Sequence, residues 1–364
     1  MKALILFLTL IVLLVSCKQK QSESVQPDNQ PDTLKYPEEV HLAKMKQLTF
    51  GGDNAEAYWS FDDSKLVFQA TNEEWGAECD QIYITNWQSD NLKTSKPILV
   101  STGFGRTTCS YFLPGDSMIL YASTHEGDKG CPPKPAARKD RKYVWPIYPD
   151  FEIYVSSLDG IIKRKLTNSP GYDAEATVSP KGDKIVFTSI RSGDLELYTM
   201  DIDGNNVRQV TNELGYDGGA FFSPDGKKLV FRASRPKTPE AVKEYKDLLA
   251  QGLVMPVEME IFICNVDGSE LKQVTNLGKS NWCPYYLPDN KRIIFSSNHH
   301  SDKGFEFNLF VINEDGSGLK QVTFDAVFDA FPVFSNNGKY LVFSSNRHNG
   351  GNFSTNLFVS EWVD

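Results

Sequence analysis

The chain has 364 residues, of which 40% are hydrophobic and 23% are charged, and its formal net charge is -9. This composition is that of an ordinary globular protein with enough apolar residues for a large core, and it excludes a fibrous or an intrinsically disordered chain. The negative charge argues against a surface built to bind nucleic acid or anionic lipid, so we expect no nucleic-acid partner.

The N-terminal residues predict export and lipid attachment. Lys2 precedes a mostly apolar run from Ala3 to Val15, which is too short for a membrane-spanning helix and typical of a secretory signal. The run ends in the residues LVSC at 14–17, which resemble a bacterial lipobox, in which the cysteine is lipidated and becomes the mature N-terminus. We therefore expect a signal peptide over residues 1–16 and lipidation of Cys17, with ordinary signal cleavage beside an incidental cysteine as the alternative.

The residues after Cys17 are rich in Gln, Ser, Pro and charged side chains. Such a composition favours a flexible tether, which we expect over residues 17–44. A lipid anchor would hold the protein at a membrane without spanning it. Because no Asp follows Cys17, the lipobox resemblance implies the outer membrane, facing the periplasm, with exposure on the cell surface as the alternative.

Six copies of one hairpin pattern occupy most of the remaining chain. Two copies are nearly identical, GYDAEATVSPKGDKIVF at 171–187 and GYDGGAFFSPDGKKLVF at 215–231. Turn-forming residues such as Pro, Asp, Gly and Asn stand between runs of β-branched and aromatic residues, which predicts a β-hairpin. The anchor residues of the copies recur every 44 to 66 residues and are Ser60, Leu113, Ser179, Ser223, Leu287 and Ser335.

A second hairpin follows each copy, for example ELYTMDIDGNNVRQVT at 196–211, with Asp-Gly at the turn. Four short strands that repeat about every 40 to 50 residues are typical of a β-propeller blade. The last copy lacks a fourth strand, whereas the strand-like segment MKQLTF at 45–50 has no blade before it. We therefore predict an all-β, six-bladed β-propeller over residues 45–364, closed by pairing of this N-terminal strand with the C-terminal blade.

The alternation of DG...LT with SPDGKKLVF over six blades resembles the TolB-like propeller repeat family. The resemblance covers residues 45–364 and implies a non-enzymatic, protein-binding scaffold at the cell envelope. TolB itself has an additional N-terminal α/β domain, where this chain has only the expected tether. We expect a monomer without a cofactor, which binds an envelope protein or a small ligand. The Gly-x-Ser-x-Gly motif of serine hydrolases does not occur in the sequence.

The longest insertions are predicted on one face of the ring. If the strands of a blade are named a to d from the axis outward, the Ser-Pro-Asp-Gly and Asp-Gly turns share one face. The b–c loops and d–a crossovers then lie on the other, here called the insertion face. Blade 2 inserts residues 124–150 in its b–c loop, and blade 4 inserts residues 235–258, where Thr238 and Pro239 predict the start of a short helix. The apolar side of that helix either packs on the propeller or contacts a partner.

The blade 2 insertion interleaves basic and aromatic side chains. It is either a solvated loop packed on the ring or a lid that binds an anion or a partner. Its candidate binding residues are Arg138, Arg141, Tyr143 and Trp145.

Polar side chains recur where each strand a begins, which we expect to be the mouth of a central channel. A ring of oxygen atoms there would suit Ca²⁺, another divalent cation or a cationic group. Alternatively, these side chains bond to neighbouring backbone in the d–a turns. The candidate residues are Asn54, Glu56, Asp173, Glu175, Asp217, Asn281 and Asp329, with Asp173 and Asp217 expected side by side.

Three cysteines, Cys79, Cys109 and Cys131, are predicted on the insertion face and are disulfide candidates in an oxidising compartment. We favour a bond between Cys109 and Cys131, with Cys79 bonded to either of them as the alternative.

A histidine cluster supplies the enzymatic alternative. His299, His300 and His348 fall in the b–c turns of blades 5 and 6. A metal site there would resemble the His-rich manganese centre of propeller-fold oligogalacturonate lyases and would imply a metal-dependent, carbohydrate-active enzyme.

Overall fold

The structure is a computed structural model that describes residues 32–364 except 90–92, 137, 141 and 350–352. The predicted signal peptide, Cys17 and the first part of the expected tether lie outside the described residues. Residues 32–364 form one compact unit. In this described part, no helix is long and apolar enough to cross a membrane.

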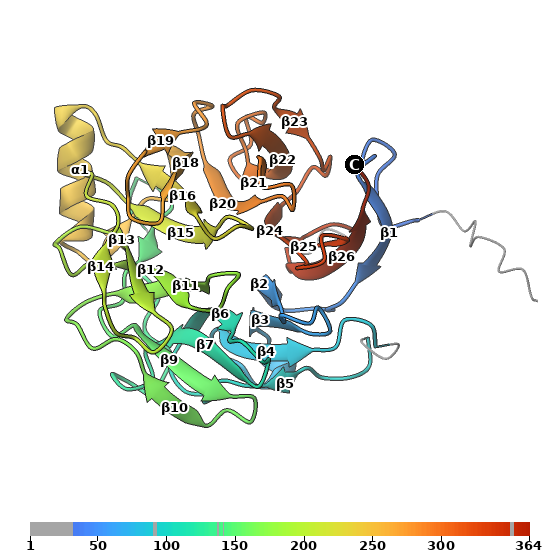
Figure 1. The fold of residues 1–364 in the computed structure, drawn as a ribbon, viewed down its shortest axis with the longest axis horizontal. Coiled ribbons are helices and arrows are strands. Elements are labelled where there is room, and N and C mark those ends of the chain that lie inside the picture. The colour runs from blue at the N-terminus through green and yellow to red at the C-terminus, as the bar shows by residue number, and fades with distance from the viewer. Residues whose placement is uncertain (1–31, 90–92, 137, 141, 350–352) are drawn as a thin grey trace, which may run out of the picture. The chain divides into compact units, whose positions relative to one another are not determined.

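The described strands form six antiparallel, four-stranded sheets around a central axis, which confirms the predicted six-bladed propeller (Figure 1). In each blade the first strand lies nearest the axis. Blade 1 comprises β2 (Asp53–Trp59), β3 (Leu66–Thr71), β4 (Gln81–Thr85) and β5 (Ile98–Leu99); blade 2 comprises β6 (Thr107–Phe112), β7 (Met118–Ser123), β9 (Glu152–Ser157) and β10 (Ile162–Lys165); blade 3 comprises β11 (Asp173–Val178), β12 (Lys184–Ser189), β13 (Glu196–Asp201) and β14 (Arg208–Gln209).

The second half of the ring repeats this arrangement. Blade 4 comprises β15 (Asp217–Phe222), β16 (Lys228–Ser234), β18 (Met259–Asn265) and β19 (Lys272–Gln273); blade 5 comprises β20 (Asn281–Tyr286), β21 (Arg292–Ser297), β22 (Asn308–Asn313) and β23 (Lys320–Gln321); blade 6 comprises β24 (Asp329–Phe334), β25 (Tyr340–Ser345), β26 (Asn356–Trp362) and β1 (Leu42–Gln47). The elements outside the blades are the 3-10 helix η1 (Glu73–Trp75), the helix α1 (Pro239–Leu249) and the short strands β8 (Trp145–Pro146) and β17 (Leu253–Val254).

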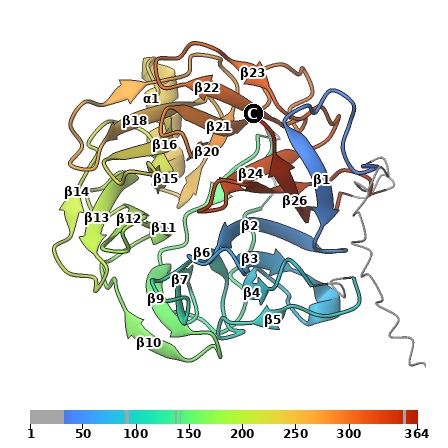
Figure 2. The ribbon, with the colours of Figure 1, turned by 45° about the vertical axis from the view of Figure 1, so that its right-hand side comes forward.

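The ring is closed by its two ends, as predicted. β1 pairs antiparallel with β26, and Gln47 stands opposite Phe358. The N-terminal strand therefore lies beside the C-terminal strand in both ribbon views (Figures 1 and 2). Just after β1, the Thr49 hydroxyl accepts a hydrogen bond of 2.9 Å from the Leu357 amide. Thr211 makes the same contact inside blade 3, so the N-terminal segment replaces the missing fourth strand in detail.

Residues 32–44 belong to the propeller unit, which corrects the prediction of a tether up to residue 44. Arg347 holds them there. Its guanidinium donates hydrogen bonds of 3.0 and 2.9 Å to the Glu39 carboxylate and pairs with Asp329 at 3.0 Å. All three side chains are fully buried. The segment is held by a buried ion pair, which its polar composition did not reveal. That composition therefore predicted a tether.

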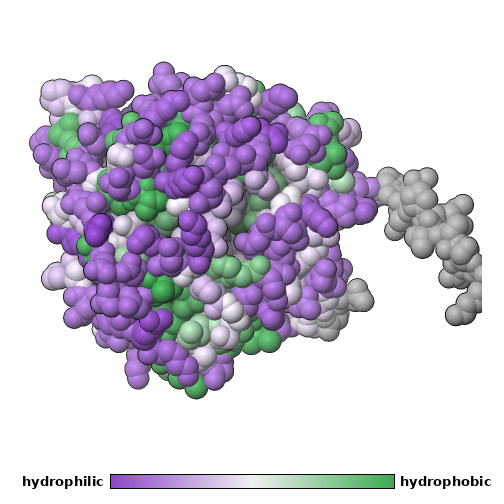
Figure 3. All heavy atoms as spheres, in the orientation of Figure 1, coloured by the Kyte–Doolittle hydropathy of each residue, from purple (hydrophilic) through white to green (hydrophobic). Residues whose placement is uncertain are grey.

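The repeat specifies the blades through burial and turn chemistry. Each blade is covered on both sides by its neighbours, so its middle strands read as continuous apolar runs. At the Ser-Pro-Asp-Gly corner, Ser223 Oγ accepts a hydrogen bond of 2.9 Å from the Lys228 amide and fixes the turn. Polar residues cover most of the face shown in Figure 3, and hydrophobic residues appear there in separate groups. Strand b has a fully buried aromatic residue near its middle in every blade: Phe68, Tyr121, Phe187, Phe231, Phe295 and Phe343.

Candidate functional site

The innermost strand of each blade contains a β-bulge, at which one residue adopts a left-handed backbone conformation. In β2 the register shifts between Ala55 and Tyr58, and Glu56 has a φ of 55°. A bulge redirects the side chain of the extra residue, and here all six such side chains or Cα atoms line one central cavity. These bulge residues, with φ between 47° and 58°, are Glu56, Cys109, Glu175, Gly219, Cys283 and Phe331.

The central cavity has a volume of about 1270 Å³ and is lined by the inner strands and by the loops of the insertion face. Four aromatic rings from β2, β6, β15 and β20 close the axis beneath it. The Tyr58 ring centroid lies 5.3 Å from that of Tyr111 and 5.8 Å from that of Phe221, which in turn lies 5.1 Å from Tyr285. This aromatic plug makes the cavity a blind pocket rather than a channel.

A buried ion pair forms one side of the cavity floor. Glu175 accepts hydrogen bonds from Arg232 Nη2 at 2.5 Å, from the Tyr216 hydroxyl at 2.7 Å and from the Thr188 hydroxyl at 2.7 Å. Burial opposes ionisation of Glu175, but Arg232 and these hydrogen bonds outweigh it and lower its pKa. The guanidinium also lies 5.4 Å from the Trp145 ring and 4.9 Å from the Tyr216 ring. The cavity thus holds a cation between a carboxylate and aromatic faces.

Gly219 makes room for this arginine. It is the one bulge residue without a side chain, and a Cβ atom there would collide with Nη1 of Arg232. Arg232 comes from strand b of the same blade and fills the place that a side chain at position 219 would occupy. Sequence reasoning missed Arg232, although a charged residue in the middle of the apolar run KLVFRAS was the available signal.

Glu56 lies in the same ring without a basic partner among the described residues. Its Oε2 atom accepts hydrogen bonds from Cys109 Sγ at 2.9 Å and from the Tyr58 hydroxyl at 3.5 Å. Burial raises the pKa of the Glu56 carboxyl to about 7, although the bond from Cys109 opposes the shift. Burial and the nearby Glu56 also raise the pKa of the Cys109 thiol well above its usual value. Cys109 is therefore a neutral donor rather than a thiolate nucleophile.

The two long insertions form a single lid, which the sequence did not reveal. β8 from the blade 2 insertion pairs antiparallel with β17 from the blade 4 insertion, and Trp145 stands opposite Val254. Lys142 pairs with Glu244 of α1 at 2.7 Å. Because blade 3 has only a short b–c turn, the lid bridges the blades on either side of it. Tyr143 and Trp145 line the cavity.

The predicted helix in the blade 4 insertion is confirmed. Thr238 caps it by accepting a hydrogen bond of 3.2 Å from the Ala241 amide. Its Tyr245 and Leu248 side chains are buried, so its apolar side packs on the protein as the first alternative proposed.

The two arginines predicted to bind a ligand in the blade 2 insertion are not found in the described cavity lining. Arg138 pairs with Asp140 of its own loop at 2.6 Å and does not line the cavity. Arg141 lies outside the described residues.

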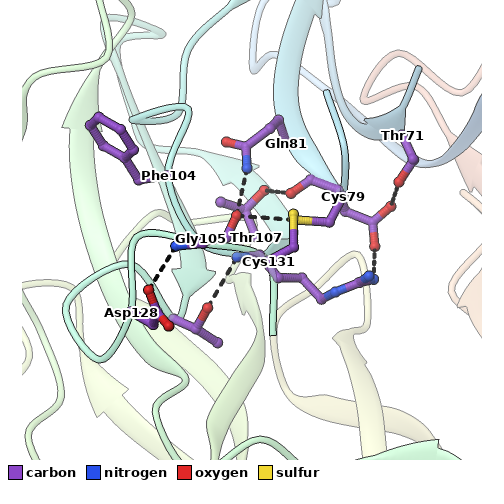
Figure 4. Close-up of a disulfide and its surroundings, with 12 residues drawn as sticks. Thr71, Cys79, Gln81, Phe104, Gly105, Thr107, Asp128 and Cys131 are labelled. Carbon is purple, nitrogen blue, oxygen red and sulfur yellow. Dashed lines mark hydrogen bonds and ion pairs between the residues drawn. A yellow bond between two sulfur atoms is a disulfide. The ribbon is translucent and has the colours of Figure 1, made fainter. Parts of the chain in front are cut away.

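The disulfide joins Cys79 to Cys131, with Cα atoms 5.9 Å apart (Figure 4). The favoured pairing of Cys109 with Cys131 is wrong, because the bulge turns Cys109 into the cavity, where its thiol meets Glu56. The disulfide attaches the lid to the start of β4, where Gln81 donates a hydrogen bond of 2.7 Å to the Gly105 carbonyl.

The residues that begin each strand a do not ring a channel mouth. All six, here called the strand-start residues, are fully buried, and they are absent from the cavity lining. Asp173 pairs with Arg191 at 2.9 Å and Asp217 with Arg235 at 2.9 Å, so the expectation that the two aspartates lie side by side at a channel mouth is wrong. These ion pairs hold the b–c turns of blades 3 and 4, whereas Asn54 and Asn281 donate hydrogen bonds to the Gly51 and Gly278 carbonyls of d–a turns, as the alternative predicts. The strand-start residues are Asn54, Thr107, Asp173, Asp217, Asn281 and Asp329.

Residues 148–248 match the family model of the TolB beta propeller domain, and the described chain has the six blades to which that repeat belongs. The described residues form a six-bladed β-propeller, which is similar to the TolB beta propeller domain over residues 148–248.

Solved structures share this fold at low sequence identity. A putative TolB from Agrobacterium tumefaciens is 19% identical, with 86% of this chain and 91% of that chain covered and a TM-score of 0.55. TolB from Acinetobacter baumannii is 18% identical, with 86% and 64% covered and a TM-score of 0.51. An oligogalacturonate lyase in complex with manganese is 15% identical, with 88% and 80% covered and a TM-score of 0.50. Comparison with curated proteins finds no match.

The three candidate histidines, His299, His300 and His348, are not assembled into one centre in the described structure. His299 bonds to Ser297 Oγ at 2.8 Å and lies beside His300, with ring centroids 5.7 Å apart. His348 bonds instead to the Leu34 carbonyl at 3.0 Å. Among the described residues no three His, Cys, Asp or Glu side chains are grouped as metal ligands would be, so the expected histidine cluster is not formed there.

Proposed function

We propose that the protein is an extracytoplasmic, lipid-anchored propeller that binds a small ligand or a segment of a partner protein in its central cavity, without catalysing a reaction. The observation that carries this proposal is the blind pocket of about 1270 Å³. Concave sites with aromatic walls and a few placed polar groups are the usual form of binding pockets. Its floor is closed by the aromatic plug, so a bound group would be enclosed from below.

The rim of the cavity supports binding to a larger molecule. Tyr143, Phe305 and Phe353 belong to its lining and are 64%, 57% and 80% exposed. They come from the b–c loops of three different blades. Exposed aromatic side chains gathered around one opening favour contact with another molecule.

A photo-crosslinking amino acid placed at Phe305 in living cells tests where the partner binds. We expect a discrete adduct from this position. The matched control is Ile161, which is 55% exposed and follows an Asp-Gly turn on the opposite face. Adducts of equal yield from both positions, or from neither, would contradict partner binding at the cavity.

The cellular location rests on separate support. The disulfide between Cys79 and Cys131 suits an oxidising compartment, and the predicted lipobox points to attachment at the outer membrane. Membrane fractionation of wild type and Cys17→Ser tests the anchor. We expect the variant to leave the membrane fraction, and a variant that stays there would contradict lipid attachment at Cys17.

Metal analysis of the purified protein tests the absence of lyase chemistry. Stoichiometric Mn²⁺ that is lost in His299→Ala would contradict the non-catalytic proposal.

A further inference from the structure

We propose that the ligand of the cavity carries an ammonium group, which pairs with the Glu56 carboxylate at the cavity floor. This inference rests on the proposed function of the cavity as a binding site and specifies the chemistry that it recognises.

The charges of the described cavity lining point to a missing cation. The lining contains five acidic and three basic side chains, and each basic side chain already has an acidic partner. Glu56 at the floor and Glu258 at the exposed rim are left without a basic partner among the described residues. The existing pairs are Arg106 with Asp80, Arg232 with Glu175 and Lys279 with Asp302, at 2.5, 2.5 and 3.4 Å.

The pair of Glu175 and Arg232 shows what Glu56 lacks. Glu56 and Glu175 occupy the same bulge position in blades 1 and 3. The blade after Glu175 supplies Arg232 from strand b. The blade after Glu56 has Ala122 at the corresponding position, directly after the buried aromatic residue of strand b. Blades 1 and 3 therefore both place a carboxylate at the bulge position, but only the carboxylate of Glu175 has an arginine partner.

The contacts of Glu56 do not compensate its charge. Cys109 and Tyr58 donate hydrogen bonds to it, but both groups are neutral. Phe221 and Phe331 belong to the same cavity lining, and aromatic faces attract ammonium groups in addition to the carboxylate. A primary or quaternary ammonium group thus fits the floor better than an anion does.

Binding of such a group should depend on pH. Because burial raises the pKa of Glu56 to about 7, the free protein keeps this carboxyl largely protonated below neutral pH. An ammonium ligand must displace that proton, so its affinity should rise about tenfold per pH unit up to about pH 7 and then level off. The charged and titratable groups that face Glu56 are Tyr58, Asp80, Cys109, Glu175, Arg232 and Cys283.

Two fluorescent probes test the inference on the full-length protein. Dansylcadaverine carries a primary ammonium group, and N-acetyl-dansylcadaverine is its neutral counterpart. We expect wild type at pH 8 to bind the ammonium probe about tenfold more tightly or better, and Glu56→Gln to remove that preference while it binds the neutral probe unchanged. Glu258→Gln is the matched control, because the same change at the exposed rim should keep most of the preference.

The outcomes separate the two proposals. Equal binding of both probes to wild type would overturn the inference about Glu56 and leave the cavity as a binding site. Loss of the preference in Glu258→Gln but not in Glu56→Gln would also overturn it. Binding of neither probe would contradict both the inference and the proposed function.

Discussion

Two sets of residues on the innermost strands lie only two positions apart and have opposite roles. The strand-start residues are Asn, Thr or Asp in every blade, and all are buried against adjacent turns. The bulge residues are Glu, Cys, Gly or Phe, and all line the cavity. In a regular strand, positions two apart point to the same side. The bulge at the second set breaks this rule, so the strand-start residues are buried in the fold whereas the bulge residues line the cavity.

The largest effect should come from loss of Arg347, the buried cation that pairs with the strand-start residue Asp329. Arg347→Met would leave Asp329 and Glu39 buried without their cation, and we expect the free energy of unfolding to fall by about 3–5 kcal/mol. Urea denaturation measures it. The control is Arg292→Met, whose ion pairs with Asp289 and Asp364 are at the surface and should contribute less than about 1 kcal/mol. Equal losses in both variants would show that the buried triad has no special role.

The disulfide gives the next effect and tests its pairing. Replacing both Cys79 and Cys131 by Ser should lower the free energy of unfolding by roughly 2–4 kcal/mol, because the unfolded chain loses a cross-link. Cys109→Ser, at a bulge position, should change it by less than about 0.5 kcal/mol. A large loss in Cys109→Ser alone would favour the pairing with Cys131 that the sequence suggested.

A methyl group at the glycine of the bulge ring should displace Arg232. Gly219→Ala adds a side chain to a left-handed residue, which costs about 1–2 kcal/mol, and it collides with the guanidinium besides. We expect a loss of unfolding free energy of roughly 2 kcal/mol or more, measured by thermal denaturation. Gly193→Ala is the control, because Gly193 also has a positive φ but faces open space. If both variants lose the same amount, Arg232 does not depend on the missing side chain.

The last effect should have the opposite sign and depend on pH. Since the pKa of Glu56 is raised to about 7 in the folded state, its ionisation weakens folding as pH rises from about 4.5 to 7. Glu56→Gln should therefore match wild type at pH 4 and exceed its unfolding free energy by roughly 3 kcal/mol at pH 8. Glu258→Gln should follow the wild-type profile, and a Glu56→Gln difference that is the same at both pH values would contradict this explanation.

The sequence was sufficient to predict the strands and turns that repeat. The Ser-Pro-Asp-Gly corner, the Asp-Gly turn and the final Leu-Thr or Val-Thr each make a local contact, so six blades, their order and their closure followed from the pattern. The helix at 239–249 was also predictable, because Thr238 and Pro239 are local start signals.

The candidate site was less predictable because its determinants are not local. Left-handed conformations at Glu56 and Glu175 have no signature in side chains of that type, and only Gly219 hinted at them. The pairing of β8 with β17 joins segments of different blades, and Cys79 and Cys109 were both plausible neighbours of Cys131 on one face. The sequence predicted correctly which face of the ring these residues lie on. It did not predict whether each side chain points into the cavity or away from it.

The closure of blade 6 has a consequence for how the protein acquires its structure. The contact between Thr49 and Leu357 spans 308 residues, so the ring cannot close during synthesis until Leu357 has been made. Closing a loop of that length instead of one blade adds only about 2 kcal/mol of entropy cost, but the delay leaves β24 and β25 as an unpaired sheet edge in the nascent chain. Such an edge is prone to pair with other chains. Early truncation before β26 should therefore produce aggregation rather than a stable five-bladed protein.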